Sequence, residues 1–235
     1  MKNILKLLVI FILTGNITAL AAPVPTATKD AAKPQEIIKK QITNMPEKTP
    51  LPQAIEKTKP NEAQKNAAND LREQAKFLYN SNKLNESLEL FSKIPDTEKI
   101  SDDWLFLANI AQDNNKEIDA VFFLKKAIQA DDKNYKAHYN LGNIYFSDNK
   151  INMALNEYRK VLRIKKDYAY AYYNKGCCYL KKKSWYNARY EFGLAIKANP
   201  EEPAFYYNLA YTYKMLKKPK KAQEALDMYN KLMTQ

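Results

Sequence analysis

The chain has 235 residues, with 38 lysines and arginines against 26 aspartates and glutamates, so its formal net charge is +12 at pH 7. It contains only four glycines, two cysteines and one histidine. Two cysteines are too few for a disulfide framework. So few glycines, and a single histidine with two cysteines, give little basis for a phosphate-binding glycine loop or a zinc site.

The amino terminus has the pattern of a secretory signal peptide. Met1-Lys2-Asn3 is followed by an apolar run over residues 4–13 and then by Ala19-Leu20-Ala21. A positive start, a short hydrophobic stretch and small residues before a cut predict cleavage after Ala21. We therefore expect a signal peptide over residues 1–21 and export to the periplasm or cell envelope. An uncleaved anchor is the alternative, although the apolar run is shorter than the roughly 20 residues that span a membrane.

Residues 22–67 predict a disordered linker. Seven of the eleven prolines lie here, among lysine, threonine, alanine and glutamine, with few large apolar residues. Such a composition cannot bury enough apolar surface to fold. The segment is expected to be a spacer that holds the rest of the chain away from a wall or membrane, to carry a short partner motif around Ile37-Ile38, or to have no specific role.

One pattern of small and aromatic residues recurs every 34 residues from about Ala68 onward. Five blocks share it: 68–100, which is one residue short, 101–134, 135–168, 169–202 and 203–235. Apolar residues three or four apart within each block predict helices that are buried on one side. Gly142 and Gly176 recur at one place of the block. Glycine weakens a helix interior by roughly 1 kcal/mol relative to alanine, so this recurrence indicates a close helix crossing.

These blocks resemble the tetratricopeptide repeat family. The resemblance is carried by the segment Tyr139-Asn140-Leu141-Gly142-Asn143-Ile144-Tyr145, by Ala154 and Tyr158 after it, and by the return of the pattern at Tyr173-Asn174-Lys175-Gly176. It implies an all-α fold, a right-handed α-solenoid of five helix-turn-helix units with a concave inner face. The sequence departs from the family pattern at His138, Lys166 and Lys175, which replace a large aromatic, a proline and a leucine.

The resemblance also implies a peptide-binding face. In this family the first helix of each unit lines the inner face, and the fifth, sixth and ninth places contribute most of the candidates here. With Lys136 at the second place, the candidate residues are Asn109, Lys136, Tyr139, Asn140, Asn143, Tyr173, Asn174, Tyr207, Asn208 and Tyr211. Asparagine amides can pair with the peptide groups of an extended segment while tyrosine rings cover its side chains. The alternative is that the asparagines bridge neighbouring repeats. The carboxylate clamp of the family is only partly matched, by Lys76, Lys136 and Asn140.

No catalytic constellation, metal site or cofactor is predicted, because active sites need converging titratable groups. The single histidine, His138, falls at a core place of its repeat, where a packed or hydrogen-bonded imidazole is expected. Cys177 and Cys178 are neighbours in a predicted helix and cannot easily bridge each other. Cys178 is expected to be a small core residue, and Cys177, on the inner face, a free thiol or an intermolecular bridge.

Charge is distributed unevenly. The first two repeats hold 9 basic and 13 acidic residues, and the last three hold 19 and 8. The lysines of the basic half can be ordinary surface residues, or they can attract an acidic partner, an anionic lipid surface or a wall polymer. Nucleic acid is disfavoured by the export signal. The final helix carries apolar residues without a following cap, which predicts self-association or docking to another protein.

The sequence therefore predicts a non-catalytic scaffold for protein–protein interaction. We expect it to hold an extended segment or loop of an envelope protein in the inner groove, during assembly of an envelope complex. Two alternatives stay open: a structural adaptor that uses its outer face and its last helix, and a binder of anionic glycan or lipid through the basic half.

Overall fold

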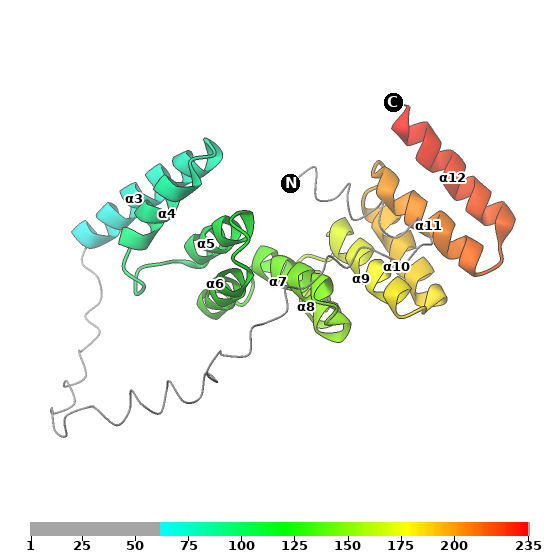
Figure 1. The fold of residues 1–235 in the computed structure, drawn as a ribbon, viewed down its shortest axis with the longest axis horizontal. Helices are drawn as coiled ribbons and strands as arrows, with labels where there is room; N and C mark the ends of the chain where they lie inside the picture. The colour runs from blue at the N-terminus through cyan, green and yellow to red at the C-terminus, as the bar shows by residue number, and fades with distance from the viewer. Residues whose placement is uncertain (1–61, 235) are drawn as a thin grey trace, which may run out of the picture. The chain divides into compact units, whose positions relative to one another are not determined.

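A computed structural model describes residues 62–234 of the chain, and within them it contains ten α-helices and no strands (Figure 1). In chain order they are α3 (Glu62–Asn80), α4 (Leu84–Lys93), α5 (Ser101–Asp113), α6 (Glu117–Ala130), α7 (Tyr135–Ser147), α8 (Ile151–Ile164), α9 (Ala169–Lys181), α10 (Trp185–Ala198), α11 (Pro203–Met215) and α12 (Pro219–Met233). The expected all-α solenoid of five helix pairs is confirmed. The predicted signal peptide and all but the end of the predicted linker lie outside the described residues.

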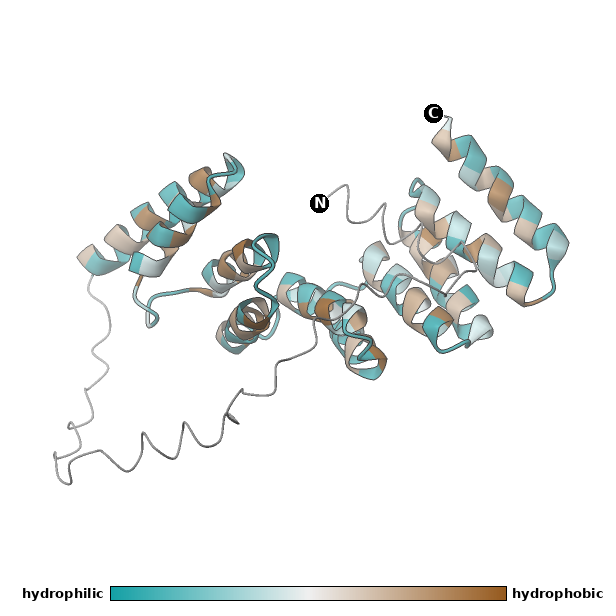
Figure 2. Cartoon of the chain, in the orientation of Figure 1, coloured by the Kyte–Doolittle hydropathy of each residue, from teal (hydrophilic) through white to brown (hydrophobic). Residues whose placement is uncertain are grey.

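Each helix packs against its neighbours in the chain. The extensive contacts join the two helices of a pair, as for α5 with α6 and α9 with α10, and smaller ones join successive pairs, as for α8 with α9. Hydrophilic and hydrophobic residues alternate around each helix (Figure 2), as expected where one side is buried and the other solvated. Among the described helices, none combines the length and the apolar character needed to cross a bilayer.

The first helix begins earlier than the sequence analysis expected. Helix α3 starts at Glu62, so the boundary of the disordered linker at residue 67 is wrong by its last six residues. Residues 62–67 are Glu-Ala-Gln-Lys-Asn-Ala, in which five residues are glutamate, alanine, glutamine or lysine, all good helix formers. Pro60 lies just before them, where proline cannot interrupt the helix.

The recurrent glycines sit at close helix crossings, as predicted. A Cβ atom added to Gly142 would lie 2.7 Å from Cε1 of Tyr158, and one added to Gly176 would lie 2.5 Å from Cε1 of Phe192. Both rings are fully buried. The second helix of the pair therefore packs its aromatic ring directly on the glycine backbone of the first.

The turn inside each pair has the same backbone geometry in every repeat. One residue per turn adopts a positive φ of 55–60°, and these residues are Asn82, Asn115, Asn149, Lys183 and Lys217. The next amide donates back to the carbonyl five residues earlier, as from Lys150 N to Tyr145 O at 2.8 Å. This is the Schellman closure of a helix carboxyl end. The repeat is thus visible in the backbone geometry of the turns as well as in the packing of the helices.

A buried ion pair joins the first repeat to the second. The guanidinium of Arg72 donates from Nε to Oδ1 of Asp103 at 2.7 Å and from Nη2 to Oδ2 at 2.8 Å. Asp103 is fully buried, and its Oδ2 also accepts from the amide of Ile100 at the start of α5. The same carboxylate therefore caps a helix and holds two repeats together.

Candidate functional site

The predicted asparagines form hydrogen bonds between neighbouring repeats. Nδ2 of Asn140 donates to Oδ1 of Asn109 at 2.9 Å, and Nδ2 of Asn174 donates to Oδ1 of Asn143 at 2.8 Å. In both pairs a sixth-place amide reaches back 31 residues to a ninth-place amide. Asn140 and Asn174 therefore bridge neighbouring repeats, which was the alternative to peptide binding in the sequence analysis.

The last of these bridges is more deeply buried. Asn208 is 1% exposed, and its Nδ2 donates to the hydroxyl of Tyr173 at 2.9 Å and contacts Sγ of Cys177 at 3.7 Å. Tyr173 is itself buried between Phe192 and Phe205, with ring centroids 5.7 and 5.0 Å away. Tyr173 and Asn208 are thus part of the interior between the fourth and fifth repeats.

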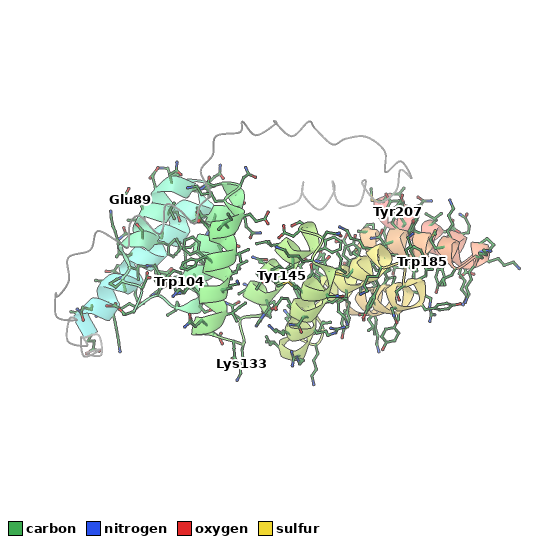
Figure 3. All side chains as sticks on the ribbon, turned by 60° about the horizontal axis from the view of Figure 1, so that its bottom comes forward. Glu89, Trp104, Lys133, Tyr145, Trp185 and Tyr207 are labelled. Atoms are coloured by element: carbon green, nitrogen blue, oxygen red, sulfur yellow. The ribbon has the colours of Figure 1, made fainter. Side chains whose placement is uncertain are left out.

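Other predicted residues are more accessible. Lys136 is exposed, and Tyr139, Tyr207 and Tyr211 are half-buried. The ring of Tyr207 packs on Tyr229 of α12 at 5.1 Å, and Figure 3 marks Tyr207 on α11. Binding of a peptide by the ten predicted residues stays a prediction, and the accessible tyrosines are better placed for it than the buried asparagine.

A group of four tyrosines surrounds the junction between the third and fourth repeats. We call this group, which consists of Tyr135, Tyr139, Tyr168 and Tyr170, the tyrosine cluster. Tyr168 lies in the turn between α8 and α9 and contacts the other three rings, with centroid distances of 5.3 Å to Tyr135, 5.1 Å to Tyr139 and 6.2 Å to Tyr170. All four are half-buried, so each presents part of an aromatic surface to solvent.

A cation accompanies this aromatic surface. Nζ of Lys165 lies 5.1 Å from the ring centroid of Tyr135 and 5.6 Å from that of Tyr168. The hydroxyl of Tyr170 donates to Oε2 of Glu202 at 2.9 Å, and burial together with that carboxylate raises the pKa of Tyr170 to about 12. Tyr170 therefore stays a neutral donor at physiological pH. Lys165 forms no ion pair with an acidic side chain among residues 62–234.

The single histidine is part of a buried polar pair. Nδ1 of His138 lies 2.6 Å from Oε2 of Glu157, and Nε2 lies 3.1 Å from the carbonyl oxygen of Asp132. The equivalent places of the second repeat hold Trp104 and Phe123, whose stacked rings are 6.0 Å apart. The expected hydrogen-bonded core imidazole is observed, and it replaces an aromatic contact.

Both cysteines are free and buried. Burial raises the pKa of the Cys177 thiol and of the Cys178 thiol to about 12, so neither is ionised near neutral pH. An intermolecular disulfide through Cys177 would require the inner face to open first. Within residues 62–234 there is no group of three or more metal-ligating side chains.

Four members of this surface, Tyr135, Tyr168, Tyr170 and Lys165, were not among the candidates predicted from the sequence. Tyr135 lies at the first place of its repeat, which supplied no candidate. Tyr168 and Lys165 lie near the end of a repeat, in the connection to the next, where the repeat pattern assigns no fixed role. Tyr170 lies at the second place, where only Lys136 was selected. The available signal was the density of tyrosines in Asp167-Tyr168-Ala169-Tyr170-Ala171-Tyr172-Tyr173.

Comparisons with known proteins agree with the helix pairs. Residues 142–183 match a model described as TPR repeat, and residues 192–224 match one described as tetratricopeptide repeat. No curated protein matched the chain. Among solved structures, MamA 41-end from Desulfovibrio magneticus RS-1 has a TM-score of 0.65 at 18% identity, covering 72% of this chain and 96% of that chain. A second MamA crystal structure has a TM-score of 0.62 at 18% identity, covering 71% of this chain and 91% of that chain.

The helix pairs therefore have counterparts both in repeat models and in known folds. The repeat unit is of a type that serves as a scaffold for protein–protein interaction rather than for catalysis. With five helix pairs in 34-residue register and two matching models, the chain belongs to the tetratricopeptide repeat family.

Proposed function

We propose that this chain is a non-catalytic scaffold that binds an extended segment or loop of another protein along the inner face of its repeats. By inner face we mean the face of α5, α7, α9 and α11 that carries the fifth and ninth places of each repeat. The single observation that carries the proposal is the tyrosine cluster with Lys165 beside it. Half-exposed tyrosines supply large contact area and hydrogen bonds at low entropic cost, which is why they are enriched in recognition surfaces.

The asparagine bridges support this function indirectly. Because Asn140 and Asn174 tie their own repeats to the preceding ones, they hold the spacing between successive tyrosines. A partner segment that runs across several repeats then meets side chains in a fixed register. Less binding energy is lost in ordering such a surface.

The envelope is the proposed setting. This part of the proposal rests on the signal-peptide pattern at residues 1–21 and on the proline-rich spacer after it. An exported scaffold on a spacer suits the assembly of an envelope complex, in which it would position one component against another.

Site-specific photocrosslinking in the native cell tests the proposal. A photoreactive phenylalanine analogue is placed at Tyr135, Tyr170 or Tyr207 on the inner face, and at Phe122 as a control, because Phe122 is exposed on α6. We expect the three inner-face positions to crosslink to one short segment of the same envelope protein, identified by mass spectrometry. Crosslinks from Phe122 with none from the inner face would contradict groove binding.

Substitution then separates binding from folding. Tyr135→Ala with Tyr168→Ala removes two partly exposed rings and is expected to abolish capture of the crosslinked partner while helicity is unchanged. Alanine at Tyr173 or Asn174 is unsuitable for this purpose, because both residues bond across repeats. Capture that survives loss of the two rings would rule out the cluster as the binding surface.

A structural adaptor is the second candidate function. Its support is the set of apolar side chains exposed on second helices, notably Ile118 at 87% and Phe122 at 53% on α6, and Met233 on α12. Exposed apolar residues close together mark docking surfaces more often than single ones do. Crosslinks from Phe122 in the experiment above would favour this function.

A further inference from the structure

A hollow between the second helix of the fourth repeat and the first helix of the fifth stands apart from the inner face. It is lined by Arg189, Tyr190, Gly193 and Leu194 of α10 and by Leu209 and Tyr213 of α11. On α11, Leu209 lies roughly 200° around the helix from Tyr207, whereas Tyr211 lies only about 40° from it. The hollow is therefore on the side of α11 that faces away from the proposed groove.

The hollow exists because Gly193 has no side chain. In steps of 34 residues, the same place holds Lys125, Arg159 and Asp227 in the other full-length repeats. A Cβ atom added to Gly193 would meet no atom within 4 Å, in contrast to Gly142 and Gly176. Glycine weakens a helix interior, and here no close crossing requires it. The space above Gly193 is open to a side chain from another molecule.

Arg189 supplies a polar group in the same hollow. Its Nε is buried and has no hydrogen-bond partner. No acidic side chain among residues 62–234 forms an ion pair with this guanidinium. A buried donor without an acceptor is unfavourable, and a guanidinium pairs most strongly with a carboxylate.

Further aromatic and basic side chains lie around the hollow. Tyr190 is 61% exposed, and Tyr186, one turn earlier on α10, is 66% exposed. Nζ of Lys221 lies 6.0 Å from the ring centroid of Tyr213. From residue 181 to the end, the chain has 11 lysines and arginines against 5 aspartates and glutamates. A second copy of so basic a surface would be repelled, and an acidic partner would be attracted.

We propose that the hollow is a second docking site, for an acidic segment of a partner protein that inserts one leucine-sized side chain over Gly193 and places a carboxylate against Arg189. The site is independent of the inner face, so the scaffold can hold two partners at once. An apolar anchor in a pocket with a charge pair beside it is the usual composition of an interface hot spot.

The experiment uses the full chain and a fluorescent nine-residue peptide of aspartate and glutamate with one central leucine. Fluorescence anisotropy at low salt measures its binding. Two comparison peptides replace the leucine by alanine or the acidic residues by lysine. We expect the leucine peptide to bind at least tenfold more tightly than either, and more weakly as salt rises.

Variants then locate the bound peptide. Gly193→Leu fills the hollow and is expected to weaken binding at least tenfold with an unchanged or higher melting temperature, since its side chain enters open space. Arg189→Gln is expected to weaken binding by a similar factor. The matched controls are Arg159→Leu, at the same repeat place in α8, and Lys197→Gln, which removes one exposed charge from α10. Both controls should bind as the unaltered chain does.

Three results would overturn the proposal. The first is equal binding of the leucine and alanine peptides, and the second is unaltered binding by Gly193→Leu. The third is loss of binding in the inner-face variant Tyr135→Ala with Tyr168→Ala, which would place the peptide in the groove. Vesicles containing phosphatidylglycerol are tested in parallel. If they bind the chain and its Gly193→Leu variant equally while the peptides do not bind, the basic surface recognises lipid and the hollow is not a docking site.

Discussion

Asn174 donates a hydrogen bond from its Nδ2 to Oδ1 of Asn143 at 2.8 Å, across the boundary between two repeats. The same Nδ2 donates to the hydroxyl of Tyr139 at 3.1 Å, and Oδ1 of Asn143 accepts a further bond from Tyr158 at 2.9 Å. The two amides and the two tyrosines thus form one network of four side chains from two repeats. A network of this kind couples its members more strongly than isolated pairs do.

The first prediction concerns this pair. Asn174→Ala is expected to lower the free energy of unfolding by about 1–3 kcal/mol, because it removes two hydrogen bonds from a partly buried network. Asn143→Ala should cost a similar amount, and the double variant less than the sum of the two. Urea unfolding followed by circular dichroism measures all three. Asn187→Ala is the control, since this exposed amide bonds to Ser184, the residue just before its own helix, and not to another repeat. Additive losses would show that the two amides act separately.

The second prediction compares two glycines on adjacent helices. Gly176→Ala is expected to lower stability by about 1–3 kcal/mol, because its methyl group would overlap the buried ring of Phe192. Gly193→Ala should raise stability by up to about 1 kcal/mol, since the methyl group meets open space and alanine is the better helix former. Thermal melts of the two variants test whether the melting temperature falls for Gly176→Ala and rises for Gly193→Ala. A stabilising Gly176→Ala would mean that the crossing is looser than described.

The third prediction is a loss of stability in acid. Burial alone would raise the pKa of Glu157, but hydrogen bonds from His138 and Lys160 outweigh it and lower that pKa. The pKa of a glutamate side chain in the unfolded chain is about 4.3. The folded state therefore binds this proton more weakly than the unfolded state. The carboxylate's contribution to stability is present above that pH and is lost as the pH falls through the folded pKa.

Urea midpoints measured from pH 7 to pH 3 test this linkage. Glu157→Gln should be less stable than the unaltered chain at pH 7 and should lose less stability below pH 4.5, because its amide does not titrate. Glu201→Gln, at an exposed position, serves as the control. Parallel curves for the Glu157→Gln variant and the unaltered chain would show that this carboxylate contributes nothing to acid unfolding.

The fourth prediction is that both thiols are protected in the native chain. With pKa values raised to about 12 by burial, Cys177 and Cys178 should react very slowly with a disulfide reagent at pH 8 and rapidly in guanidinium chloride. The release of the coloured thiolate measures both rates. Fast native labelling of Cys177, detected by peptide mapping, would instead reveal frequent opening between the fourth and fifth repeats.

The sequence was sufficient for the helices because their determinants are local and repeated. Gly142 and Gly176 recur at one place, and only a close crossing explains both. The start of α3 was placed too late because the repeat pattern begins at Ala68, whereas the helix begins at Glu62, before the repeat. Residues 62–67 do belong to a helix, but their composition alone did not separate them from the linker.

The site was harder to predict because function depends on contacts between repeats. Asn140 and Asn174 can face a ligand or a neighbouring repeat at the same sequence spacing, and only the geometry shows where their Nδ2 atoms point. Tyr168 and Lys165 come together with Tyr135 across a turn. The hollow over Gly193 depends on an absent side chain, which a search for chemically active residues overlooks.

The positive φ angles in the turns affect the stability of the repeats. Asparagine tolerates a positive φ fairly well, yet two of the five turns place lysine there, at Lys183 and Lys217. Those two loops carry local strain that glycine would relieve without altering either proposed binding surface. Glycine substitutions at these two turns are therefore a route to a more stable variant of this scaffold.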